Sequence, residues 1–266
     1  MNTNSNTYTV IYSAILVIVV AAVLAFAAMS LKPLQDTNVK VETISKVLVA
    51  AEISTPDAKM SNEEVMKTYS SSIKSAILVN GKGEVKGTLS TDAGNIQIYT
   101  QSDLKAQNDI IKKIQSGDTK LLDDLRLPVY IFNVNGKDIP VVPCYGAGLW
   151  GPIWGYIAFE EDLNTVKGAI FDHKGETPGL GAEIANLKFS EQFDGEQIRN
   201  NSGEFVSIKV VKGGADKDDR NAVDAISGGT ITSTALQTTL YNWLNLYIPY
   251  FNNNRVSTPA VTIEEE

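Results

Sequence analysis

The sequence predicts an α+β protein, in which a single N-terminal transmembrane helix precedes a soluble domain with a mainly antiparallel sheet and flanking helices. Residues 10–29 form an apolar stretch without a charged side chain. Two pairs of apolar runs are each joined by Asn-Gly, a dipeptide typical of β-hairpins. Later strand patterns alternate with loops and not with the regular crossover helices of a parallel sheet, which indicates the α+β class.

The apolar stretch predicts a membrane anchor. Its 20 residues would form a helix about 30 Å long, which matches the thickness of a hydrocarbon core. A cleavable signal peptide is the alternative, because Ala25-Phe26-Ala27 is similar to a peptidase site. The apolar run is longer than in most signal peptides, however, and residues 1–9 contain neither Lys nor Arg. A retained transmembrane helix after a short N-terminus is therefore favoured.

Residues 31–144 are expected to form a membrane-proximal α+β region. Apolar residues at helical spacing predict a short helix from Ile44 to Ala51. The sequence Ser61-Asn62-Glu63-Glu64 is a capping-box pattern that begins a second helix, which ends near Ser72. A third helix contains Leu104 and Ile111 and is stopped by Gly117.

Two hairpins are predicted in the same region. Residues 75–79 would pair with a strand at Val85 across Asn80-Gly81. Residues 129–134 would pair with residues 139–142 across Asn135-Gly136. Both pairs support an antiparallel sheet.

Residues 145–250 differ in composition, being rich in glycine and aromatic residues from Gly146 onward. Strands are predicted at residues 156–159, 166–171 and 206–211. A helix follows with Thr232 or Ser233 as its N-cap, because apolar residues then recur every three or four positions. Beyond it, residues 251–266 are expected to form a mobile acidic tail.

Composition and charge exclude several kinds of site. The formal net charge is −8 and no basic stripe is present, which argues against nucleic-acid binding. The single cysteine, Cys144, excludes an internal disulfide and any cysteine-based metal framework, and its apolar neighbours predict a buried thiol. The single histidine, His173, gives poor support to a metal site or a proton relay. No metal ligands and no catalytic residues are assigned, and neither Cys144 nor His173 receives a role.

The stretch from Ser227 to Ser233 reads Ser-Gly-Gly-Thr-Ile-Thr-Ser and stands directly before the last predicted helix. Glycines let the backbone approach a ligand closely, and the free amides and positive end of a helix favour an anion. These residues therefore indicate a place that holds a phosphate. The alternative is a turn with a helix cap and no ligand.

Three segments of the chain resemble one protein family. The pattern Asp224-x-x-Ser227-Gly228-x-Thr230-x-Thr232 resembles the flavinylation motif of FMN-binding proteins. Residues 146–156 and 175–181 resemble, in the same order and at similar spacing, the C subunits of sodium-translocating NADH:quinone reductases. The likeness implies one FMN per chain, which a flavin transferase attaches by its phosphate to Thr230. One departure is Gly229, where the family usually has alanine.

The resemblance makes residues 145–250 the FMN-binding region and implies which residues surround the cofactor. The expected contacts of the ring wall are Leu149, Trp150 and Leu180. The expected contacts of the polar edge or ribityl chain are Glu176, Thr177, Gly179 and Gly181. The residues expected beside the phosphate are Ser227, Gly228, Gly229 and Thr232. For the wall residues, filling the core is the alternative role, as it is for Trp154 and Tyr156.

The implied function is that of an electron-carrying subunit in a sodium-translocating NADH:quinone oxidoreductase, between redox centres of partner membrane subunits. The chain shows no nucleotide fingerprint and no complete active site for NADH oxidation. The resemblance implies an inner-membrane protein with a periplasmic domain, whereas Lys32, Lys40 and Lys46 after the anchor favour a cytoplasmic one. Alternatives are the G subunit of an Rnf-type complex and a membrane-anchored binding protein without a redox group.

Overall fold

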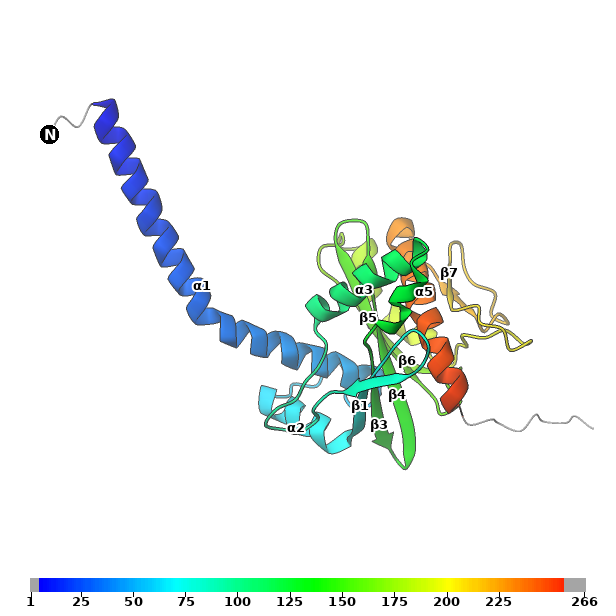
Figure 1. Cartoon of the computed structure of the whole chain (residues 1–266). Helices are drawn as coiled ribbons and strands as arrows, with labels where there is room; N and C mark the ends of the chain where they lie inside the picture. Colours follow the sequence, from blue (N-terminus) through cyan, green and yellow to red (C-terminus); the bar gives the residue numbers. More distant parts are fainter. Residues whose placement is uncertain (1–4, 256–266) are drawn as a thin grey trace, which may run out of the picture. The chain divides into compact units, whose positions relative to one another are not determined.

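The structure, a computed structural model, describes residues 5–255 (Figure 1). Residues up to 42 form one unit and residues from 43 onward form a second, and helix α1 (Asn6–Ala50) belongs to both. The helix is long and apolar enough to cross a membrane. The predicted anchor at residues 10–29 and the short helix expected from Ile44 are therefore parts of one continuous helix.

The second unit is built on one six-stranded sheet, whose order is β2-β1-β3-β4-β5-β6. Every neighbouring pair in this sheet is antiparallel, which confirms the predicted α+β class. The boundary expected between residues 144 and 145 lies inside β4, so both predicted regions contribute to the same sheet. The strands are β1 (Ile73–Val79), β2 (Val85–Thr88), β3 (Leu127–Val134), β4 (Lys137–Ala147), β5 (Pro152–Phe159) and β6 (Val166–His173).

Helices and short helical turns connect and cover these strands (Figure 1). The helix α3 (Gln101–Gln115) lies beside α5 (Thr230–Asn254). A hydrogen bond of 3.2 Å, which the indole of Trp243 on α5 donates to Asn108 on α3, joins the two helices. The same indole is 2.7 Å from the carbonyl oxygen of Tyr145 on β4. The elements are α2 (Asn62–Ser72), α3 (Gln101–Gln115), η1 (Thr119–Asp123), η2 (Gly181–Ala185), α4 (Leu187–Ser190), η3 (Glu191–Phe193) and α5 (Thr230–Asn254).

The two faces of the sheet are covered by different elements. Pro140 and Val141 follow each other on β4, so their side chains point to opposite faces. Pro140 lines a small cavity with Tyr250 of α5. Val141 is in register through β5 with Gly168 on β6, where an added Cβ would lie 2.7 Å from the Ala50 carbonyl oxygen of α1. The end of α1 and helix α5 therefore pack on opposite faces, and large apolar side chains on both faces form the core.

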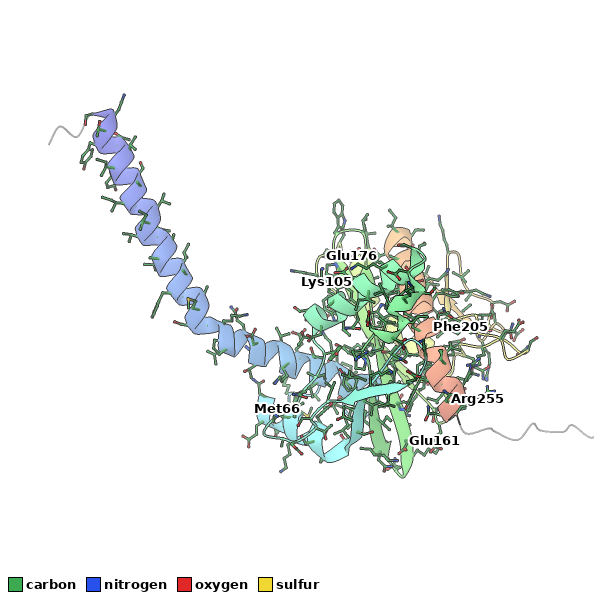
Figure 2. All side chains as sticks on the ribbon, in the orientation of Figure 1. Met66, Lys105, Glu161, Glu176, Phe205 and Arg255 are labelled. Atoms are coloured by element: carbon green, nitrogen blue, oxygen red, sulfur yellow. The ribbon has the colours of Figure 1, made fainter. Side chains whose placement is uncertain are left out.

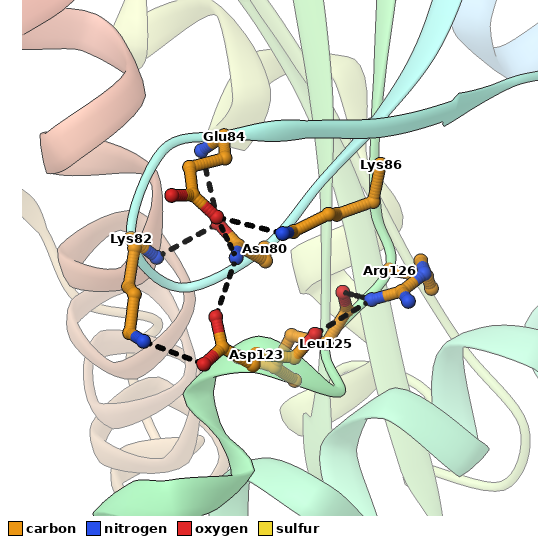
Figure 3. Close-up of polar contacts among 7 residues, drawn as sticks. All are labelled: Asn80, Lys82, Glu84, Lys86, Asp123, Leu125 and Arg126. Atoms are coloured by element: carbon orange, nitrogen blue, oxygen red, sulfur yellow. Dashed lines mark hydrogen bonds and ion pairs between the residues drawn. The ribbon is translucent and has the colours of Figure 1, made fainter.

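Both predicted hairpins are present, and each turn has a physical cause. Asn135 and Gly136 have φ values of 53° and 84°, the positive pair that a tight turn between β3 and β4 requires. The turn between β1 and β2 is longer and is organised by the buried side chain of Asn80 (Figure 3). Its carbonyl oxygen accepts from the amide of Glu84 at 2.9 Å, and its NH2 group donates to Asp123 at 3.0 Å.

The helix signals before the sheet are confirmed as well. The Ser61 hydroxyl accepts from the Glu64 amide at 3.3 Å, and the Ser61 amide donates to the Glu64 carboxylate at 2.7 Å, which completes the capping box of α2. The helix α3 ends before Gly117, whose φ of 109° only glycine adopts readily.

In the last third of the chain one predicted strand is shorter than expected, and another strand was not predicted. The strand expected at residues 206–211 is reduced to β7 (Lys209–Val211), because Ser207 has a φ of 62° that interrupts an extended chain. The strand β7 pairs in parallel with β8 (Ala222–Asp224), which sequence periodicity did not indicate. This small sheet stands immediately before the segment that carries the phosphate-binding pattern.

Both ends of the last helix also differ from the prediction. The helix α5 begins at Thr230 with Gly229 as N-cap, so neither Thr232 nor Ser233 caps it. Both side chains are buried in its first turn, and Ser233 accepts a hydrogen bond of 3.1 Å from the Ile226 amide. At the other end the helix continues through Asn254, so the tail expected from residue 251 begins later. The rest of that predicted tail, residues 256–266, lies outside the described residues.

Candidate cofactor-binding site

A cavity of about 240 Å³ lies where three chain segments meet. They are the loop between β4 and β5, the segment after β6, and the turn that leads into α5. Most of the site residues predicted from the sequence are brought together here. The cavity is lined by Leu149, Glu176, Thr177, Leu180, Gly181, Gly228, Gly229, Thr230, Ile231 and Thr232.

Thr230 occupies the first position of α5 and is exposed. The N-cap, Gly229, has no side chain to satisfy the helix end. The first amide that donates to the N-cap carbonyl is that of Ser233, at 2.9 Å. The amides of residues 230–232 therefore have no intrahelical acceptor, so the Thr230 hydroxyl stands beside groups that attract an anion.

The glycines around Thr230 are required by close contacts. Gly228 has a φ of 75°, and a Cβ there would lie 2.6 Å from the Leu180 side chain. A Cβ on Gly229 would approach Ile226 to 2.9 Å. Gly181 leaves room for Glu176, whose carboxylate would be 2.5 Å from a Cβ at that position. The segment before α5 thus packs directly on the turn that ends at Gly181.

Glu176, labelled in Figure 2, is buried, lines the cavity and holds the other two of its segments. One carboxylate oxygen accepts from the Trp150 amide at 2.9 Å, and the other accepts from the Thr232 hydroxyl at 2.5 Å. Burial alone would raise the pKa of this carboxyl, but the hydrogen bonds from Thr232 and Trp150 lower it by more than burial raises it. The pKa of Glu176 therefore lies below its ordinary value. Both oxygens of the Glu176 carboxylate thus hold other segments of the protein, and its contact with a ligand stays a prediction.

The predicted wall residues, which lie in or beside the lining of the cavity, are exposed to solvent. Leu149 is 46% exposed, Trp150 68% and Leu180 42%. These values contradict the alternative in which the wall residues fill the core, whereas Trp154 and Tyr156 are buried in it. Exposed Leu149 and Leu180 thus place apolar surface beside the start of α5.

Ile231 is a wall residue that the sequence analysis missed, and it is 59% exposed. The sequence offered one signal, which is the position of Ile231 directly after Thr230. This position faces the cavity because α5 begins at Thr230. Trp150, Gly179 and Ser227 do not line this cavity. Trp150 borders it through its backbone, and Gly179 has a φ of 74° in the turn before Leu180. Ser227 lines a neighbouring hollow of about 490 Å³ together with Asp224.

Thr230 also borders a larger cavity, of about 480 Å³, between α3 and α5. Its walls carry amide, hydroxyl and lysine side chains. They include Asn108, Lys112, Gln115, Tyr145, Thr234, Thr238 and Asn242. Thr230 is therefore accessible from two sides.

His173 and Cys144, to which the sequence analysis assigned no role, have structural contacts in the fold. The Nδ1 atom of His173 accepts a hydrogen bond of 3.2 Å from the Glu176 amide, which fixes the start of the segment after β6. Cys144 is buried in β4, as predicted. Within residues 5–255 no group of acidic, histidine or cysteine side chains could hold a metal ion.

Comparisons with known proteins identify an FMN-binding domain in the part of the chain that contains this cavity. The model of the FMN-binding domain matches residues 148–245, which include all three segments of the cavity. The C subunit of the Na(+)-translocating NADH-quinone reductase of Vibrio vulnificus is 31% identical over 233 residues, covering 85% of this chain and 86% of the relative. The corresponding protein of Pseudomonas aeruginosa is 29% identical and covers 91% and 93%.

Solved structures give the same result. The crystal structure of the corresponding protein from Parabacteroides distasonis is 35% identical, with a TM-score of 0.65 over 83% of this chain and 96% of that one. The crystal structure of Shewanella oneidensis NqrC is 29% identical, with a TM-score of 0.63, and covers 81% and 97%. The chain belongs to the family of C subunits of the Na(+)-translocating NADH-quinone reductase.

Proposed function

We propose that the chain carries one FMN through a phosphoester to Thr230 and passes electrons between redox centres of partner subunits in a sodium-translocating NADH:quinone reductase. The observation that carries the proposal is the exposed Thr230 hydroxyl, at the start of α5 and at the edge of a glycine-lined cavity. Thr232 and Ser233 in the same turn lack this combination, because their side chains are buried.

The residues present suit an FMN group. The free amides at the start of α5 suit its phosphate, since they donate hydrogen bonds and the helix end is positive. The exposed side chains of Leu149, Trp150, Leu180 and Ile231 suit a flat ring with apolar faces. A bound FMN supplies one- and two-electron chemistry, and the protein positions it and excludes water from one side.

Attachment requires help from a second protein. A threonine hydroxyl is a weak nucleophile, and the described residues place no histidine or carboxylate in hydrogen-bond contact with Thr230. A separate flavin transferase would therefore activate it and recognise the surrounding motif. Asp224 is exposed six residues before Thr230, and its carboxylate accepts from the Ala215 amide at 2.7 Å, which fixes its direction for such recognition.

Electron transfer to and from the ring would occur at its exposed side. The wall residues are open to solvent, so a partner protein can approach the cavity without a change in the fold. No step of NADH oxidation is assigned to this chain, and another subunit would receive the hydride. The coupling to sodium transport would be a property of the assembled complex.

The helix α1 would anchor this carrier in the cell inner membrane, with the second unit on the periplasmic side. The apolar part of α1 is long enough to span the bilayer, and uncharged residues precede it. Protease added to intact spheroplasts should digest the chain after Lys32. Complete protection would show that the domain is cytoplasmic, as the lysines after the anchor favour.

The test of the flavin assignment uses the full chain, produced with and without a flavin transferase. A denatured gel band of wild type should fluoresce under ultraviolet light only when the transferase is present. Thr230→Ala should fold, insert and lack the flavin, while the control Ser227→Ala should keep it. An FMN adduct that mass spectrometry finds on Thr232 or Ser233, or finds in Thr230→Ala, would contradict the assignment.

A further inference from the structure

We propose that Glu176 is a positioning residue for the flavin, whose carboxylate ties the Trp150 loop to the first turn of α5 and lowers the reduction potential of the ring. The positioning part rests on the fold alone. The effect on the potential rests on the proposed function, because it requires FMN on Thr230. Thr232 takes part in this positioning, because its hydroxyl donates the hydrogen bond that holds the carboxylate.

The hydrogen bonds of Glu176 connect segments that are far apart in the sequence. Trp150 follows β4, and Thr232 lies on α5. Each donates to a different oxygen of the carboxylate, at 2.9 Å and 2.5 Å. The apolar wall and the attachment site therefore meet through one side chain, and the distance between Trp150 and Thr230 depends on it.

The packing around the carboxylate leaves it one position. A Cβ on Gly148 would lie 2.6 Å from one oxygen of Glu176, and a Cβ on Gly181 would lie 2.5 Å from the other. The carboxylate thus occupies space that only glycines on both sides leave free. This arrangement explains two glycines of the site without any ligand contact.

The charge of Glu176 is not neutralised by an ion pair within the described residues. The side chain is 5% exposed and lines the cavity, so solvent screens its charge poorly. The Nδ1 atom of His173 accepts a hydrogen bond from the Glu176 amide, so this ring contacts the backbone of Glu176. Since reduction adds negative charge to a flavin, a fixed carboxylate in the wall disfavours it and lowers the potential.

Two substitutions test the connection between the segments and the charge of the carboxylate separately. Thr232→Val removes the hydroxyl and keeps the shape and the carboxylate, so it should loosen the connection between the segments. Thr232→Ser keeps the donor and serves as the matched control. Glu176→Gln removes the charge and keeps an oxygen that can accept from the Trp150 amide.

Positioning is tested first, in full-length protein produced without a flavin transferase. Amide hydrogen exchange at Trp150 should become at least about tenfold faster in Thr232→Val, because the hydrogen bond from Thr232 to the charged carboxylate is lost. Thr232→Ser should exchange like wild type. Unchanged exchange in Thr232→Val would overturn the positioning role, and this result does not depend on any cofactor.

The potential is then measured by redox titration of the flavin-loaded full chain. Glu176→Gln should shift the midpoint to a less negative value, and Thr232→Ser should leave it unchanged. An equal or more negative midpoint in Glu176→Gln would overturn the electrostatic role. If wild type carries no flavin, the proposed function and the claim about the potential both fail, while hydrogen exchange still decides the positioning role.

Discussion

Lys46 in the last turns of α1 forms an ion pair with Asp172 on β6, and its ammonium group lies 5.5 Å from the centre of the Trp154 ring. The two charged side chains are only 16% and 23% exposed. The contact joins the end of the apolar helix to the strand that leads into the candidate site. The end of α1 is thus held on the sheet by both charge and an aromatic ring.

Asp172→Asn should destabilise the second unit by about 1–3 kcal/mol, because a hydrogen bond to a mostly buried charge is lost. Urea unfolding of the full chain in detergent, followed by tryptophan fluorescence, measures the change. Asp109→Asn is the matched control, since Asp109 pairs with Lys105 on α3 and both side chains are largely exposed. It should change stability by less than about 0.5 kcal/mol. Equal effects of the two variants would contradict the structural role of Lys46.

Trp150→Ala and Leu180→Ala should alter the flavin and not the fold. Both side chains are exposed, so their removal creates no cavity in the core. In flavin-loaded protein the absorption maximum or the fluorescence yield should move, and the unfolding midpoint should stay within error. Tyr241→Ala is a control, because Tyr241 is 48% exposed and lies outside the lining of the cavity. Unchanged spectra in both variants would place the ring elsewhere, for example in the cavity between α3 and α5.

Gly229→Ala should reduce stability and flavin loading, and a second substitution should restore them. An added Cβ would lie 2.9 Å from the Ile226 side chain, and this crowding has a cost of about 1–3 kcal/mol. Ile226→Ala in the same chain removes the Cγ2 atom that lies nearest to the added methyl group, so the double variant should recover part of the loss. Urea unfolding and in-gel flavin fluorescence measure both effects. A single variant identical to wild type would show that the segment adjusts without strain.

The thiol of Cys144 should be inert in the folded protein. Burial raises its pKa to about 12, so almost no thiolate forms at neutral pH. Above the unfolded pKa of about 8.5 the unfolded chain loses this proton and the folded chain keeps it, so stability falls as the pH rises toward about 12. A thiol reagent at about pH 8 should label wild type only in urea, and Cys144→Ala should lose less stability at alkaline pH. Rapid labelling of native protein would contradict the burial.

Local elements were predictable from the sequence where short-range physics sets them. The capping box at Ser61 and the Asn135-Gly136 turn specify their elements through bonds and φ values of adjacent residues. Gly117 ends α3 for the same reason. The cluster around Thr230 was also recognisable, because glycines and hydroxyl residues before an apolar periodic run indicate a helix start that can hold an anion.

Predictions failed where a distant partner decides the local structure. Thr232 and Ser233 are good capping residues, yet Thr232 donates to Glu176 and Ser233 accepts from Ile226, so the helix begins earlier, at Thr230. The parallel pairing of β7 with β8 and the interruption at Ser207 depend likewise on contacts that no local pattern encodes.

The sequence by itself determined that the chain has an apolar helix, an antiparallel sheet and a threonine-bearing glycine segment, because these follow from composition, periodicity and turn chemistry. Only the tertiary structure decided that the wall residues Trp150 and Leu180 are exposed and that Glu176 connects the Trp150 loop to α5. Exposure and hydrogen-bond partners depend on which segments meet in space. The close packing at Gly148 and Gly181 is a property of the whole fold. The atoms in contact there come from the β4–β5 loop, from the segment after β6 and from α5.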